Sequence, residues 1–167
     1  MKADFWTWAV KAYGGEGVAA ACLSLQDDHG QNVPLLLWAV WLDGPVDEAL
    51  ALKAAELARL WSDEVIVPLR FLRRRLKTAL TEGDAAHRLP LREKIKGLEL
   101  EAERALMAQL VVLENPIKFE TNQNVNERAM ASLRRVSGVW GEVAPDLALE
   151  RLTEALIKGQ FLGYDGE

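Results

Sequence analysis

The feature that most constrains the fold is the run VPLLLWAVWL, from Val33 to Leu42, which holds no polar side chain. These ten residues are about half of what a membrane-spanning helix needs. Pro34 fixes its own backbone near helical values and keeps Val33 out of the α region, so we predict a helix from Pro34 to Leu42. Because a helix that is apolar on every side has no face to turn to water, it must lie in the middle of the core.

The rest of the chain predicts further helices around this central one. Ala, Leu, Glu and Arg fill most windows, whereas Val, Ile and Thr are sparse, a composition that favours helix over strand. Apolar residues and helix-ending signals predict helices over residues 4–13, 16–28, 34–42, 47–61, 63–82, 90–113, 125–138 and 145–160. A chain of 167 residues is most economically one domain, residues 1–167, and we expect residues 163–167 to be disordered. We therefore predict an all-α fold, a compact single-domain bundle of about six to eight helices.

Several functional classes lack their signatures in this sequence. The single cysteine, Cys22, excludes an internal disulfide and a multi-cysteine zinc site, and it fits a reducing compartment. The start, MKADFWTWAVKAY, lacks the uninterrupted apolar core of a signal peptide. There is no nucleophile elbow, phosphate loop or dinucleotide fingerprint. We predict a cytoplasmic protein with no membrane span, no cofactor and no metal.

A pair of glutamates is one of two features that suggest a metal. Glu99 and Glu103 lie four residues apart in the helix predicted from Pro90. Paired carboxylates on facing helices build di-metal sites, but those sites also need a Glu-x-x-His motif on each of two helices, and this chain has none. We therefore expect both glutamates on a solvated helix face.

Charge is distributed unevenly along the chain. Residues 70–96 hold nine basic and three acidic residues, a net charge of +6, whereas residues 1–69 carry −6 and residues 97–167 carry −5. Within the basic segment, Arg70, Arg73, Arg74 and Lys77 recur at i, i+3, i+4 and i+7, so they share one face of an amphipathic helix. This stripe is open to four interpretations: salt bridges within the protein, an acidic protein partner, nucleic acid, or a membrane surface. An overall pI near 5.2 argues against nucleic acid, since dedicated nucleic-acid-binding domains are usually basic throughout.

A second candidate site is the polar corner QDDHGQN before the central helix. Gly30 can end the preceding helix in a left-handed conformation, and Gln31 and Asn32 can satisfy free N–H groups at the next helix start. Gln26, Asp27 and Asp28 lie in the last turn of the preceding helix, where the macrodipole disfavours each carboxylate by about 0.3–1 kcal/mol. A salt bridge to an arginine, a ligand or partner site, or a metal would offset this cost.

The first block of the chain also resembles a known family. The pattern Trp8…Tyr13…Cys22-Leu23-x-Leu25-Gln26-Asp27-x-x-Gly30-x-x-Val33-x-Leu35-Leu36-Leu37-x-x-x-Trp41-Leu42 is similar to small bacterial proteins, mostly from proteobacteria, that are catalogued as a domain of unknown function. The stretch from Glu99 to Glu103 is similar too, and the resemblance covers about residues 5–115. The family pattern has a small polar residue where Pro34 stands, which argues against a role for that side chain. The resemblance implies a helical cytoplasmic protein and no known activity.

Three functions remain open after these observations. The leading prediction is a non-catalytic binding or adaptor protein that contacts an acidic partner through Arg70, Arg73, Arg74 and Lys77. The alternative is an enzyme or small-molecule-binding protein with a pocket lined by Gln26, Asp27, Asp28 and Asn32. In that case Asp27 would be the acid/base group and Asn32 an orienting donor. A further alternative is nucleic-acid binding through residues 70–77.

Overall fold

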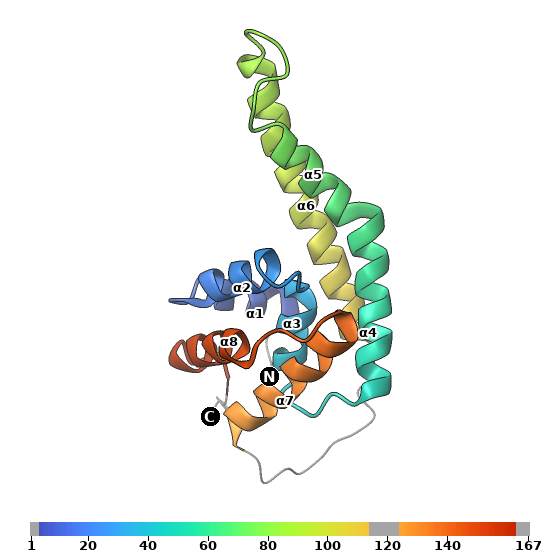
Figure 1. The fold of residues 1–167 in the computed structure, drawn as a ribbon, viewed down its shortest axis with the longest axis vertical. Coiled ribbons are helices and arrows are strands. Elements are labelled where there is room, and N and C mark those ends of the chain that lie inside the picture. The colour runs from blue at the N-terminus through green and yellow to red at the C-terminus, as the bar shows by residue number, and fades with distance from the viewer. Residues whose placement is uncertain (1–3, 114–123, 163–167) are drawn as a thin grey trace.

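The computed structural model describes residues 4–113 and 124–162, and this part of the chain is built from helices without any strand. In chain order these are α1 (Phe5–Tyr13), α2 (Val18–Asp27), α3 (Val33–Trp41), α4 (Glu48–Trp61), η1 (Ser62–Ile66), α5 (Val67–Arg75), α6 (Ala85–Val112), α7 (Val125–Trp140) and α8 (Asp146–Lys158). The all-α fold class is therefore confirmed. The helices form a body from which one pair of helices extends (Figure 1).

The short apolar helix α3 lies at the centre of the body, as predicted. Its residues from Pro34 to Val40 are all buried. It packs against α7 and α6, and also against α1, α2 and α4. The helix begins one residue earlier than predicted, at Val33, because the Asn32 side chain accepts a hydrogen bond from the Leu35 N–H and caps the first turn.

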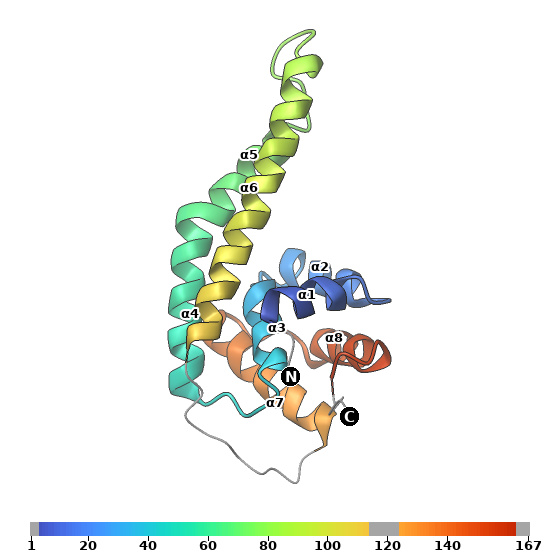
Figure 2. The same cartoon turned by 180° about the vertical axis from the view of Figure 1, so that it is seen from behind.

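The second architectural feature is a helical hairpin that projects from the body. Helices α4, η1 and α5 form one continuous, bent path, and α6 returns beside it (Figures 1 and 2). We call residues 67–98, which comprise α5, the turn at the tip and the outer half of α6, the arm. Both views show the arm extending well beyond α1, α2 and α8. The chain segment with net charge +6 is thus the segment that leaves the body.

The predicted break at residues 62 and 63 does not occur. The Ser-Asp pair looks like a new helix cap, but Ser62 and Ile66 are buried against the neighbouring helices. The helix passes this point through a π-helical turn, in which the Val67 N–H donates to the Ser62 carbonyl five residues back. Burial of this turn outweighs the local capping signal. The prediction of a helix from 63 to 82 was also wrong at its far end, since α5 stops at Arg75.

Helix α6 begins at Ala85, before the predicted start at Pro90. Asp84 holds this earlier start in place, because its carboxylate accepts hydrogen bonds from the Leu80 and Thr81 N–H groups at 2.7 and 3.2 Å and from Arg88 Nε at 2.8 Å. Pro90 therefore lies inside the helix, where it removes one backbone donor near the N-terminal end. Helices α7 and α8 lie within two residues of their predicted bounds. The predicted disorder of residues 163–167 concerns residues outside the described part of the chain.

Candidate functional site

Two arginines of the predicted basic stripe bind inside the hairpin. Arg70 Nε donates to Glu99 Oε1 at 2.8 Å, and Arg73 Nε donates to the other oxygen of the same carboxylate. Arg70 Nη2 also reaches Glu103 Oε1 at 3.1 Å. Only 6% of Glu99 is exposed, so the expectation that it lies on a solvated face was wrong. These arginines join α5 to α6 where the arm leaves the body.

The pKa values of the two glutamates in this cluster shift in opposite directions. Burial raises the pKa of Glu99, but the hydrogen bonds from Arg73 and Arg70 outweigh it, so the pKa of Glu99 is lowered overall. Burial also raises the pKa of Glu103, and there the attraction to Arg70 does not compensate, partly because the Glu99 charge lies nearby. Glu99 is thus the main counter-ion of the two arginines.

Arg74 links the arm to the body. Its Nη2 atom lies 3.3 Å from Asp27 Oδ1, at the C-terminal end of α2, and both side chains are about half exposed. A hydrogen bond from Gln26 Nε2 at 3.1 Å and the Arg74 charge together lower the pKa of Asp27. A salt bridge to an arginine was one of the explanations considered for the carboxylates in the last turn of this helix, and Arg74 forms such a bridge with Asp27. An exposed pair of this kind contributes little to stability, typically about 0–1 kcal/mol.

Hydrogen bonds within the fold hold four further residues of the corner: Asp28, Gly30, Gln31 and Asn32. Asp28 accepts a hydrogen bond from Ser24 Oγ at 2.8 Å, and Asn32 caps α3. Gly30 has a positive φ of 62°, and its carbonyl accepts a bond from the Trp140 indole N–H at 2.8 Å. Gln31 Nε2 donates to the Glu142 carbonyl at 2.9 Å. The stretch from Gly30 to Asn32 therefore fastens α3 and the end of α7 to each other.

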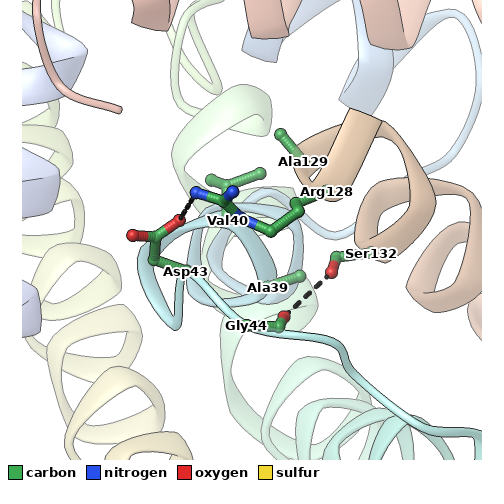
Figure 3. A pocket seen from close by; sticks show the side chains of 7 residues that line it. All are labelled: Ala39, Val40, Asp43, Gly44, Arg128, Ala129 and Ser132. Carbon is green, nitrogen blue, oxygen red and sulfur yellow. Dashed lines mark hydrogen bonds and ion pairs between the residues drawn. The ribbon is translucent and has the colours of Figure 1, made fainter. Parts of the chain in front are cut away.

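Neither of two hollows that the described residues form is lined by residues 26–32. The first holds about 10 Å³ between α3 and α7, room for one water molecule at most. Figure 3 shows its rim, where Arg128 pairs with Asp43 at 3.2 Å and Ser132 Oγ donates to the Gly44 carbonyl at 3.3 Å. The second is an open groove of about 400 Å³ along α2 and α8, with small residues on its floor. Neither places an acid/base pair in an enclosed site.

No metal site or membrane span emerges from the described residues. Among them, no three His, Cys, Asp or Glu side chains converge as metal ligands do. None of their helices combines the length and the apolar character needed to cross a membrane.

The arm carries cations that have no acidic partner within the described residues. Arg88 is held by Asp84, and Arg92 pairs with Glu93. The remaining cations are exposed and form no ion pair in the part of the chain that the structure describes; they are Arg75, Lys77, Lys94 and Lys96. Of the predicted stripe, only Lys77 is in this group. Sequence reasoning missed Lys94 and Lys96, although their place in the +6 segment was visible.

Comparison with known proteins identifies the family to which this chain belongs. The model of a family described as "Protein of unknown function (DUF2390)" matches residues 4–110, well over half of the chain. The chain belongs to this family. No curated protein and no solved structure matches it. The DUF2390 match ends just before the end of α6, so it includes the central helix, the Glu99 cluster and the whole arm.

Proposed function

We propose that this protein is a non-catalytic docking protein of the cytoplasm that binds an acidic partner protein through its arm. The observation that carries the proposal is the separation of charge: a segment of net charge +6 projects from the helical body, and the sequence before and after this segment carries −6 and −5. Such a distribution steers an acidic surface towards the arm and away from the body.

The free cations indicate which part of the arm makes the contact. Arg70 and Arg73 are held by Glu99, so a partner would have to compete with that cluster for them. Lys77 and Lys94 are exposed and form no ion pair in the described residues, so they are available without any rearrangement. Arg74 is half exposed but already paired with Asp27 on the body, so a partner would have to compete for it.

The competing functions have less support. A binding site at the Gln26–Asn32 corner would need a pocket there, and the hollows described above lie at other places, between α3 and α7 and along α2 and α8. Nucleic acid would also be drawn to the arm, but a long polyanion would meet the acidic body beside it. A cytoplasmic location is supported by Cys22, a free and buried thiol whose pKa burial raises to about 12, since a reducing compartment keeps thiols free.

The test compares two double charge reversals with wild type in pull-downs from bacterial extract. Lys77→Glu/Lys94→Glu changes the arm, and the matched control Lys11→Glu/Lys53→Glu makes the same charge change on exposed positions of the body. We expect a protein held by wild type and by the control to be lost by the arm variant, and its affinity for wild type, measured after purification, to fall as salt rises. Arg70→Glu is unsuitable because it would break the Glu99 cluster.

The outcomes separate the alternatives. A partner retained by the arm variant refutes the proposal, as does the absence of any partner in all three pull-downs. Loss of the captured material after nuclease treatment would show that nucleic acid is the ligand.

A further inference from the structure

Large apolar side chains are unusually exposed on the arm. Between residues 67 and 100 the structure exposes Val67, Phe71, Leu72, Leu80, Leu89, Leu91, Leu98 and Leu100. A contiguous exposed apolar patch on a folded protein commonly marks a surface that another molecule covers. The position of these residues around the two helices shows where such a patch is continuous.

One flank of the arm gathers leucines from both helices. Leu91 and Leu98 are seven residues apart on α6, so they share a face at a separation of about 10 Å. On α5, Leu72 adjoins Arg73, whose bond to Glu99 fixes it at the level of Leu98. Leu98 therefore lies between the other two, with Leu91 further out along α6 and Leu72 across from it on α5.

This flank faces away from the body. At about 100° per residue, Leu72 lies nearly opposite Arg74, which reaches back to Asp27 on α2. On α6, Leu98 lies about 120° from Arg104, whose guanidinium stacks over Trp6 of α1 at 5.5 Å. Both contacts mark the body side of the arm, so the three leucines line the opposite side, where the described residues place no further helix.

Charge selects the occupant of this strip. Helical spacing places Arg75 of α5 at one edge, and Lys94 together with the exposed Glu101 of α6 at the other. Arg75 and Lys94 form no ion pair among the described residues. A second copy of the same arm would bring more cations than carboxylates together along these edges, which is unfavourable. A helix with an apolar stripe between acidic residues would instead match both the leucines and the cations.

We propose that the strip of Leu72, Leu91 and Leu98 is the seat of an acidic amphipathic helix of the partner protein. The proposal rests on the docking function above and adds the form of the partner: its leucine-like anchors pack on the strip, and its carboxylates pair with Arg75 and Lys94. In this mode of recognition an amphipathic helix lays its apolar face on an apolar surface, and the apolar anchors supply affinity while the flanking charges supply orientation.

The chain offers a closely matched control for testing this seat. Leu91 and Leu98 are 49% and 51% exposed, whereas Leu89 and Leu100, on the other flank of the same helix, are 48% and 53% exposed. Leu91→Gln/Leu98→Gln therefore removes the strip, and Leu89→Gln/Leu100→Gln makes the same chemical change at equal exposure elsewhere. Circular dichroism and urea unfolding must first show that both variants are as folded as wild type.

The probe is a fluorescent helical peptide of about 20 residues with leucines at 3–4 spacing and glutamates at most other positions, read by anisotropy. We expect it to bind wild type and the Leu89/Leu100 control alike, and to bind the Leu91/Leu98 variant about tenfold more weakly. A second peptide with lysine in place of each glutamate should bind none of them. No binding of the acidic peptide to wild type, or equal loss in both variants, would overturn the inference.

Two further outcomes distinguish this inference from the docking function. If Lys77→Glu/Lys94→Glu loses the cellular partner but Leu91→Gln/Leu98→Gln keeps it, the helix seat is wrong while the charge-based docking stands. If light scattering finds a wild-type dimer that Leu91→Gln/Leu98→Gln converts to a monomer, a second copy covers the strip and the inference is overturned.

Discussion

Replacing Glu99 with glutamine removes the charge that Arg70 and Arg73 share. The glutamine keeps one oxygen that can accept a hydrogen bond, and its NH₂ group would face arginine donors. The substitution preserves size and helix propensity, so any change in stability reports on the charge cluster and not on packing. This variant tests whether the root of the arm is held by that single carboxylate.

The expected loss follows from the geometry of the cluster. Glu99 accepts a bond from Arg70 at 2.8 Å and another from Arg73 Nε, and a hydrogen bond to a charged group is worth about 1.5–3 kcal/mol. Breaking a fully buried pair costs about 3–5 kcal/mol, but the arginine side chains here are 19% and 20% exposed and can turn partly to water. We therefore expect Glu99→Gln to lower the free energy of unfolding by about 2 kcal/mol at pH 7.

The pH dependence has a definite sign. The pKa of Glu99 is lowered in the folded protein, so its contribution is present above its ordinary value of 4.5 and disappears as the pH falls through the lowered value. The difference between wild type and Glu99→Gln should therefore shrink as the pH is lowered below that range. The pKa of Glu103 is raised in the folded protein, so its effect on stability has the opposite sign. Glu103 favours folding at a pH below its ordinary pKa of 4.5, and this stabilisation disappears as the pH rises through the raised pKa.

Glu103→Gln is the matched control, since it also contacts Arg70. Removing a carboxylate whose burial is not compensated should leave the free energy of unfolding at pH 7 within about 0.5 kcal/mol of wild type. Both variants would be measured by urea unfolding from pH 3 to pH 8, and amide exchange of α5 would report whether the loss is local. Equal losses in the two variants, or a loss below about 0.5 kcal/mol for Glu99→Gln, would refute the reasoning.

Three smaller predictions test the corner and the tip. Asn32→Ala should lower the free energy of unfolding by about 1 kcal/mol because α3 loses its cap, whereas Asp28→Ala should change urea unfolding by less than about 0.5 kcal/mol. Asp27→Asn should cost less than about 0.5 kcal/mol in the same assay because its pair with Arg74 is exposed; a loss near 2 kcal/mol would mean that the pair is buried in solution. The pKa of Asp84, lowered to about 2 chiefly by the Arg88 hydrogen bond, predicts an ordered tip above the ordinary value of 3.8 and loss of that order as the pH falls towards 2. In wild type, amide exchange at Leu80 and Thr81 should become faster as Asp84 is protonated. In Asp84→Ala the exchange at these two amides should show no such transition over the same pH range.

The regular part of the fold could be predicted because it depends on local patterns. The apolar run with Pro34 at its start identifies α3 as central, and the cap at Asn32 needs only the residues beside it. The bounds of α1, α2, α4, α7 and α8 likewise follow from stripes and stop signals within a few residues. Local rules failed at Ser62 and Pro90, where a π-turn and a tip held by Asp84 overrule them.

The candidate site depended on contacts between distant parts of the chain. The sequence identified the basic stripe and the acidic end of α2, but not that Glu99, 26 to 29 residues further on, neutralises two of its arginines.

The sequence by itself determined that the chain is helical, that one short helix is central, and that positive charge gathers in residues 70–96. Only the tertiary structure decided that this segment projects as an arm, which of its cations are already paired, and which leucines remain exposed. The physical reason is that periodicity fixes which residues share a helix face, whereas the partner of each face is set by the packing of elements far apart in the chain.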